Sequence, residues 1–316
     1  MVTAPLAVVF FGTPEFAVPT LDALLASPHR VVGVVTQPDK PRGRGQKTSA
    51  GPVKARASAA GIPVLQPATL KDPDVMTALH ALRADIGVVA AYGKILSDAV
   101  LAVPRLGMIN VHASLLPRYR GAAPIHRAII AGEAETGVTI MRVVRALDAG
   151  PMLAKASRAI ADDDTSDVVE RDLARIGASL LVDTLNEVAA GQSHETAQDD
   201  RLATYANRLT KDDGIVEWSR PARAIHNQIR GLHPWPHAFS FVSDDRIILL
   251  RSHVAGDGAA PPGTVVAASG DDLVVATGAG LLALTQLQRE GKRPASAREF
   301  LAGRPLKPGD RFRPQP

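Results

Sequence analysis

The sequence predicts an α/β fold in which a mostly parallel sheet with helices on both faces is followed by a small antiparallel β-barrel. Before residue 190, apolar runs of strand length alternate with helix-like segments, which is typical of a parallel sheet and its crossover helices. After residue 207 the segments become short strands separated by Gly, Pro and Asp turns, which favours a barrel. A chain of 316 residues is long enough for two domains with a core each.

The elements of the first part follow from hydrophobic periodicity and give a Rossmann-like arrangement. The expected strands are Leu6–Phe11, Val31–Thr36, Ile86–Ala91, Met108–His112 and Val138–Val143. The expected helices between them are Phe16–Ala26, Pro52–Ala60, Asp74–Arg83 and Ala123–Ala131. Ligands of such sheets bind beyond the carboxyl ends of the strands, so polar residues at those ends are candidates for a site.

A longer helix is expected to begin at Thr165 as its N-cap and to end at Gly191, because an apolar stripe runs between them. The segment Gln192–Arg201 is polar and aperiodic, which indicates a linker or a strap between domains. We therefore predict a Rossmann-like domain over residues 1–190, a linker over 191–207 and a second domain over 208–316.

The second domain is expected to be an OB-like barrel. One helix, Pro221–Arg230, precedes its strands, and a short helix near Ser296–Leu301 follows them. The expected strands are Phe239–Val242, Arg246–Val254, Thr264–Ala267, Leu273–Thr277 and Leu281–Leu287. Small barrels of this kind often bind nucleic acids or sugar chains.

The composition narrows the class of protein. Hydrophobic residues make up 46% of the chain and charged residues 22%, as in soluble globular proteins. The absence of cysteine excludes disulfides, thiolate zinc sites and cysteine nucleophiles within this sequence, and the nine histidines show no metal-ligand spacing, so we expect no metal. The apolar runs are too short to span a bilayer and the first residues lack a signal-peptide layout, which predicts a cytoplasmic protein.

The net charge of +4 is unevenly distributed. Residues 1–207 carry 21 basic and 21 acidic side chains, whereas residues 208–316 carry 15 basic and 11 acidic ones, which accounts for the whole excess. Within the neutral part, a glycine-rich segment holds Lys40, Arg42, Arg44 and Lys47, with Lys54 and Arg56 following and no acid among them. Two separated basic features favour an extended polyanion as ligand, although solvated surface charge is the simpler alternative.

The strongest candidates for chemistry are two polar residues at the end of a predicted strand. Asn110 and His112 stand at positions i and i+2, so their side chains emerge on the same face, just before a loop rich in Pro and Gly. An amide N–H beside an imidazole is suited to stabilise an oxyanion while a proton moves, which indicates acyl transfer. Asp148, in a turn after the next strand, is a candidate to orient the imidazole or to accept a proton through water. From the residues alone, a structural histidine and a turn-forming aspartate stay open as alternatives.

Gly12 follows the first predicted strand, a position that invites a nucleotide-binding interpretation. The glycine spacing of a dinucleotide site and the lysine of a Walker motif are both missing. A tight turn is the better interpretation of this glycine.

Beyond these separate residues, the string Asn110–Ile125, which reads NVHASLLPRYRGAAPI, resembles the signature of folate-dependent formyltransferases. The segments FGTPEFA at residues 11–17, TQPDKPRGRG at 36–45 and GLHPWP at 231–236 resemble the members of that family that act on methionyl-tRNA. The resemblance covers nearly the whole chain. One departure is Ala113, because a glycine is frequent after the histidine in this family.

The resemblance implies transfer of a formyl group from 10-formyltetrahydrofolate, as co-substrate, to the amino group of methionyl-initiator-tRNA. It implies catalytic roles for Asn110, His112 and Asp148. It also implies folate contacts and tRNA contacts, which fall respectively on Ser114, Leu115, Leu116 and Pro117 and on Lys40, Arg42, Arg44 and Lys47. Neither a metal, a membrane nor an obligate protein partner is implied. The basic segment over 40–47 is expected to become ordered on RNA.

Two other functions compete with this one. A sugar-nucleotide formyltransferase or a formyltetrahydrofolate hydrolase would share the same three catalytic residues, so the site alone does not decide between them. The basic segment and the charge of the second domain favour tRNA. A non-catalytic RNA-binding protein built on the barrel gives no reason for Asn110, His112 and Asp148 to stand at strand ends.

Overall fold

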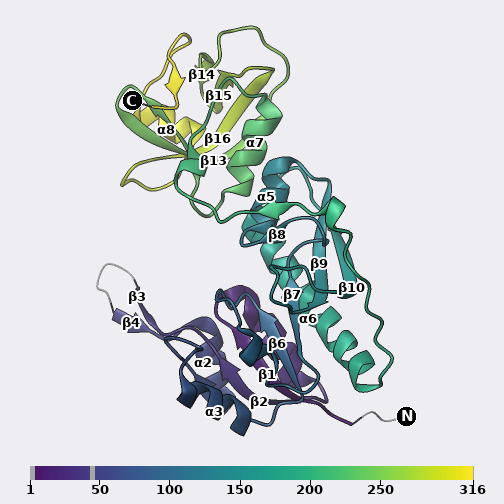
Figure 1. Ribbon diagram of the computed structural model, residues 1–316. Coiled ribbons are helices and arrows are strands. Elements are labelled where there is room, and N and C mark those ends of the chain that lie inside the picture. The colour runs from purple at the N-terminus through teal and green to yellow at the C-terminus, as the bar shows by residue number, and fades with distance from the viewer. Residues whose placement is uncertain (1–3, 43–46, 316) are drawn as a thin grey trace. The chain divides into compact units, whose positions relative to one another are not determined.

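The computed structural model describes residues 4–42 and 47–315, and these form two compact units that interleave along the chain (Figure 1). The first unit comprises the chain up to Pro124, together with Glu135–Arg158 and Glu170–Ala206. The second comprises Ile125–Ala134, Ala159–Val169 and the chain from Asn207 onward. The sequence analysis expects contiguous domains instead, joined by a linker over residues 191–207.

The first unit is built on a mixed sheet with the strand order β10-β9-β7-β6-β1-β2-β5. The strands are β1 (Ala7–Gly12), β2 (Arg30–Val35), β5 (Val64–Leu65), β6 (Ile86–Ala90), β7 (Met108–His112), β9 (Glu135–Arg142) and β10 (Met152–Ala159). The five strands from β7 to β5 run parallel, and β9 pairs antiparallel with β7. The predicted mostly parallel sheet is therefore confirmed. Strand β10 was not predicted; its first residue is buried, and exposed and partly covered residues alternate only in its later part.

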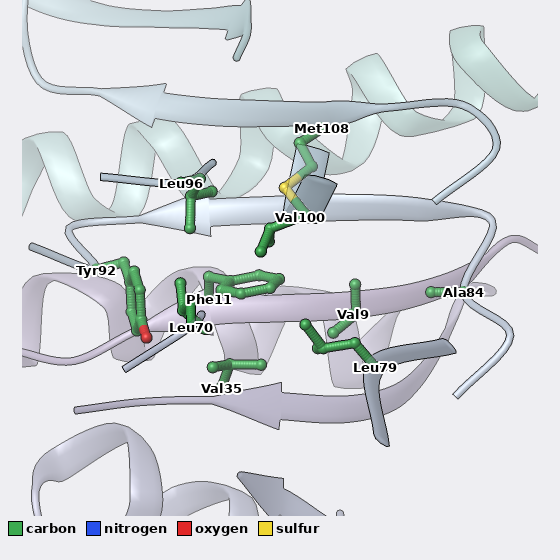
Figure 2. Close-up of a cluster of buried hydrophobic side chains, with 10 residues drawn as sticks. All are labelled: Val9, Phe11, Val35, Leu70, Leu79, Ala84, Tyr92, Leu96, Val100 and Met108. Carbon is green, nitrogen blue, oxygen red and sulfur yellow. The ribbon is translucent and has the colours of Figure 1, made fainter. Parts of the chain in front are cut away.

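Helices cover both faces of this sheet. They are α1 (Val18–Ala26), preceded by the 3-10 turn η1 (Glu15–Ala17), α2 (Pro52–Ala59), α3 (Pro73–Ala81), α4 (Asp98–Leu101) and α6 (Ser166–Ala189). On one face, Phe11 packs edge-to-face on Tyr92 at 5.5 Å between ring centroids, within a buried cluster that includes Leu79 of α3 and Val100 of α4 (Figure 2). On the other, a Cβ on Gly177 of α6 would lie 2.7 Å from Val111, so that helix approaches β7 closely.

The segment that was expected to be a basic loop contains a short antiparallel hairpin. Strands β3 (Lys40–Arg42) and β4 (Lys47–Ser49) pair with Lys40 opposite Ser49 and Arg42 opposite Lys47. Arg44 lies outside the described residues. The paired ends give this segment more regular structure than its composition predicts.

The second unit contains a curled antiparallel sheet with the order β14-β15-β16-β13-β12-β18, to which β17 adds on β16. Its elements are η3 (Asp212–Gly214), α7 (Ala222–Gly231), β12 (Ala238–Val242), β13 (Asp245–Val254), β14 (Val265–Ser269), β15 (Asp272–Ala276), β16 (Leu281–Arg289), β17 (Ala295–Ser296), α8 (Ala297–Gly303) and β18 (Phe312–Arg313). A bridge between Thr264 and Arg311 joins the two ends of this order, so the sheet closes as in a barrel. The predicted small barrel is thereby confirmed.

Two stretches from the middle of the sequence pack within the second unit. Helix α5 (Pro124–Ala131) carries Arg127, which pairs with Asp213 at 2.7 Å. Arg230 of α7 donates to the carbonyl oxygen of Ala161 at 2.9 Å, and His226 contacts the carbonyl oxygen of Asp162 at 2.9 Å. None of the helices in the described part of the chain is both long and apolar enough to cross a membrane.

Removing the Phe11 ring is expected to leave a cavity that the sheet and its helices cannot fill. Phe11→Ala is therefore expected to lower the free energy of unfolding of the first unit by about 3–5 kcal/mol, measured by urea denaturation. Ile95→Ala is the control, because the Ile95 side chain is 88% exposed and its loss changes stability by less than about 0.5 kcal/mol. Equal midpoints for the two variants would contradict this view of the core.

Candidate active site

Strand β7 places Asn110 and His112 on the same face of the sheet, at its carboxyl end. Asn110 lies opposite Val89 of β6 and Met141 of β9, and His112 lies opposite Thr139. His112 is buried, whereas Asn110 is half-buried. The Asn110 amide donates no hydrogen bond among the described residues, so its N–H groups are available to a ligand. The two residues that the strand pattern singled out do share one face.

The imidazole of His112 is held by the backbone of the loop that follows β7. Its Nε2 lies 3.0 Å from the carbonyl oxygen of Tyr119. A carbonyl oxygen only accepts hydrogen bonds, so Nε2 carries the proton of neutral His112 and Nδ1 keeps its lone pair. The sequence analysis considered Asp148 as the group that orients this ring; in the structure the Tyr119 carbonyl fixes the tautomer.

Asp148 faces the other ring nitrogen. Its Oδ2 lies 3.7 Å from His112 Nδ1, which is beyond hydrogen-bond length but close enough to stabilise an imidazolium. The same oxygen accepts a hydrogen bond of 2.8 Å from the backbone N–H of Gly121. Of the three residues suggested by the sequence, the structure brings His112 and Asp148 close together, and Asn110 lies on the same strand face as His112.

Thr139 of β9 fixes the backbone of the segment from Ser114 to Pro117. The Thr139 hydroxyl donates to the carbonyl oxygen of Ser114 at 2.7 Å and accepts from the N–H of Leu116 at 3.1 Å. Ser114 and Leu116 are buried, and Leu115 and Pro117 are partly exposed. Of the predicted folate contacts, Leu115 and Pro117 are thus the side chains most accessible to a ligand.

The loop after Pro117 is tied to a later segment of the same unit, residues 196–206, which we call the strap. Strand β8 (Arg120–Gly121) pairs in parallel with β11 (Tyr205–Ala206), which follows the 3-10 turn η2 (Asp200–Leu202). The N–H of Tyr119 donates to the hydroxyl of Thr204 at 2.8 Å. The strap therefore supports the residue whose carbonyl holds His112, a role that its sequence did not reveal.

Known proteins are similar to this chain over most of its length. The sequence profile of the Formyl transferase family matches residues 5–185, and that of the Formyl transferase C-terminal domain matches residues 208–305. A methionyl-tRNA formyltransferase of Citrifermentans bemidjiense is 48% identical over 303 residues, which are 96% of this chain and 95% of that protein. Another, of Stutzerimonas stutzeri, is 50% identical and covers 92% of this chain and 93% of its own length.

The chain belongs to the methionyl-tRNA formyltransferase family. The predicted resemblance is thereby confirmed, and the chain is identified as a formyltransferase. Among solved structures, the N-formyltransferase of Helicobacter canadensis, in complex with folinic acid and dTDP-3-aminofucose, superposes with a TM-score of 0.67 at 17% identity. It covers 88% of this chain and 99% of its own, and this likeness concerns the fold.

The basic segment of this formyltransferase is held at its first end by contacts of Asp39. Asp39, which precedes β3, pairs with Lys54 at 2.5 Å and accepts a hydrogen bond of 2.8 Å from Gln66. The hydrogen bond from Lys54 holds the pKa of the Asp39 carboxyl below its ordinary value. Lys54 pairs with Asp39 and Arg56 pairs with Asp22, so the charges of these two cations are balanced by nearby carboxylates. The side chains of Lys40, Arg42, Arg44 and Lys47 lie outside the described residues.

Two further expectations concern Gly12 and metals. A Cβ on Gly12 would lie 2.6 Å from the Phe10 ring and 2.9 Å from Ala17, so close packing at the start of η1 requires glycine there. In the part of the chain that the structure describes, no three His, Cys, Asp or Glu side chains gather as a metal site would require.

The Tyr119 contact predicts which tautomer neutral His112 adopts. Nitrogen NMR of protein labelled at its histidines is expected to show a protonated Nε2 and an unprotonated Nδ1 in the neutral ring. The His112→Gln spectrum assigns the signals. A protonated Nδ1 in the neutral ring would contradict the geometry described above.

Proposed function

We propose that this formyltransferase transfers the formyl group of 10-formyltetrahydrofolate to the amino group of methionyl-initiator-tRNA, and that it does so in the cytoplasm. The full-length similarity to methionyl-tRNA formyltransferases supports the choice of reaction. The observation that carries the mechanism is the Tyr119 contact, which leaves the Nδ1 lone pair of His112 beside Asp148, on the strand face that carries Asn110.

The attacking amine must be neutral before it can form a bond to the formyl carbon. We assign this deprotonation to Nδ1 of His112, whose lone pair the Tyr119 contact preserves. The resulting imidazolium keeps its Nε2–H on the Tyr119 carbonyl and gains an Nδ1–H that faces the Asp148 carboxylate. Asp148 thus offsets the positive charge that proton transfer creates.

Attack forms the new C–N bond and moves the carbonyl electron pair onto oxygen. The amide N–H groups of Asn110 are the donors assigned to this oxyanion, because they have no partner among the described residues. The tetrahedral intermediate then collapses, the bond between the formyl carbon and the folate nitrogen breaks, and that nitrogen takes up a proton. His112 returns its proton to that nitrogen, which restores the neutral imidazole, and the second proton that the amine nitrogen loses as it becomes an amide is released to solvent.

The folate is assigned to the loop over residues 114–117, where Leu115 and Pro117 offer apolar surface and Thr139 holds the backbone. A solved protein of the same fold is described in complex with folinic acid, which is consistent with this assignment. The tRNA is assigned to the hairpin residues Lys40, Arg42, Arg44 and Lys47 and to the basic excess of residues 208–316.

The reaction itself is the first test. Formyl transfer to methionyl-initiator-tRNA is measured for wild type, Asn110→Ala and His112→Ala, with release of the folate product as the second readout. We expect kcat/KM to fall about 10²–10³-fold for Asn110→Ala, the loss of an oxyanion donor, and about 10²–10⁴-fold for His112→Ala, the loss of a general base. His194→Ala, an exposed histidine of the same unit, is the matched control and keeps wild-type activity.

Different outcomes exclude different functions. Folded wild type that formylates an aminosugar nucleotide but not methionyl-tRNA would overturn the choice of acceptor. Binding of tRNA without release of folate product from any amine would favour a non-catalytic RNA-binding protein.

The hairpin assignment predicts a separate effect on tRNA. Arg44→Ala is expected to raise KM for methionyl-tRNA and to flatten its salt dependence, because a phosphate contact and its released counterion are lost. Lys71→Ala, an exposed cation elsewhere in the same unit, serves as control. Unchanged KM and unchanged salt dependence in Arg44→Ala would exclude this role.

A further inference from the structure

The side-chain amide of Gln198 links the two loops that face the His112 ring. Its Nε2 donates to the carbonyl oxygen of Asp148 and to that of Gly150, each at 2.8 Å. Its Oε1 accepts two hydrogen bonds from the guanidinium of Arg120, from Nε at 3.0 Å and from Nη2 at 2.8 Å. Both N–H groups and both oxygen lone pairs of one amide are thereby used.

The Asp148 turn is a segment that needs such support. Asp148 has a φ of +47°, in the left-handed region, which is unfavourable for a residue with a side chain. Two residues later, a Cβ on Gly150 would lie 1.9 Å from the carbonyl oxygen of Arg142, so the turn is pressed against the end of β9. The two hydrogen bonds from Gln198 hold the backbone on either side of this tight contact.

Arg120 fixes the opposite end of the amide. The Arg120 side chain is only 4% exposed, and its Nη2 also pairs with Asp200 at 2.7 Å. The buried guanidinium is therefore neutralised by a carboxylate other than Asp148. This leaves the Asp148 charge for the His112 ring, and it makes Gln198 a neutral spacer between the buried cation and the Asp148 turn.

The hydrogen bonds form a closed path around the imidazole. Arg120 lies between Tyr119, whose carbonyl contacts His112 Nε2, and Gly121, whose N–H binds the Asp148 carboxylate. Gln198 connects Arg120 to the backbone of Asp148 across the chain. A displacement of the amide would therefore change the distance between the Asp148 carboxylate and His112 Nδ1.

We propose that Gln198 is a positioning residue of formyl transfer, which acts through Asp148 by fixing its carboxylate beside the His112 ring. This inference rests on the proposed function only in needing an amine acceptor, and it applies to whichever amine the wild type formylates. Loss of the two N–H donors lowers kcat and leaves substrate binding unchanged, because the side-chain hydrogen bonds of Gln198 in the described structure go to Arg120, Asp148 and Gly150 and to no residue of loop 114–117.

The test compares two substitutions that remove the donors in different ways. Gln198→Met removes the whole amide at similar length, whereas Gln198→Glu keeps an acceptor for Arg120 and loses only the donors to the Asp148 turn. Both are expected to lower kcat about 10–100-fold, as small misplacements of catalytic groups do, with KM for folate and acceptor within about twofold of wild type. Gln192→Met, the same change at an exposed position before the strap, is the control with wild-type kcat.

A double-mutant cycle with Asp148→Asn distinguishes positioning from general stability. If Gln198 acts through Asp148, the double variant Gln198→Met/Asp148→Asn has the same kcat as Asp148→Asn alone. Wild-type kcat in both Gln198 variants, or losses that multiply in the double variant, would overturn the proposal. Should Gln198→Met fail to fold, Gln198→Glu carries the same cycle, because its acceptor for Arg120 is retained.

The proposed acceptor is tested apart from this role. A wild type that formylates only an aminosugar nucleotide would overturn the tRNA assignment, and the kcat ratios of the Gln198 variants would then be measured with that amine. Wild-type activity on methionyl-tRNA with unaffected Gln198 variants would overturn the positioning role alone.

Discussion

The hydrogen bond between His112 Nε2 and the Tyr119 carbonyl is the constraint on which the site depends. It fixes one proton of the ring on a backbone group, and so leaves Nδ1, the base of the proposed mechanism, with its lone pair. With the opposite tautomer, an N–H rather than a lone pair would face Asp148, and the strand face with Asn110 would hold no base. The placement of Asp148 has chemical meaning only because this backbone contact exists.

That contact requires an ordered loop after β7, and two parts of the chain distant in sequence provide the order. Thr139 of β9 holds the backbone at Ser114 and Leu116, and Thr204 of the strap holds Tyr119. The sheet contributes the candidate catalytic side chains, while the strap fixes the loop that orients one of them. A segment without helix or strand periodicity thereby acquires a structural role that a flexible linker would not fulfil.

The sequence was informative where local pattern decides the outcome. Asn110 and His112 were found because strand periodicity puts both on one face, and Asp148 because a polar residue in a turn after an apolar strand is easily seen. Strand β10 was missed, since its sequence MLAKASRA lacks the β-branched and aromatic residues that indicate a strand. The hairpin β3–β4 was read as a loop because Gly and basic residues dominate its composition. The roles of Tyr119 and Gln198 rest on a backbone carbonyl and on contacts 50 and 78 residues apart, which no local pattern encodes.

Formyl transfer to tRNA requires both proton transfer and phosphate recognition, and these two processes act over different distances. The proposed proton transfer depends on contacts of 3.0 and 3.7 Å around one ring, and a shift of a fraction of an ångström alters them. Phosphate recognition acts over the Debye length of about 10 Å, so it tolerates variation in where each cation lies. The pairing of Lys54 with Asp39 and of Arg56 with Asp22 weakens the contribution of these two cations to that field. Charge counts along a sequence can therefore locate phosphate recognition. The contacts for proton transfer are seen only in the folded structure, where the strap, the loop after β7 and strand β7 meet.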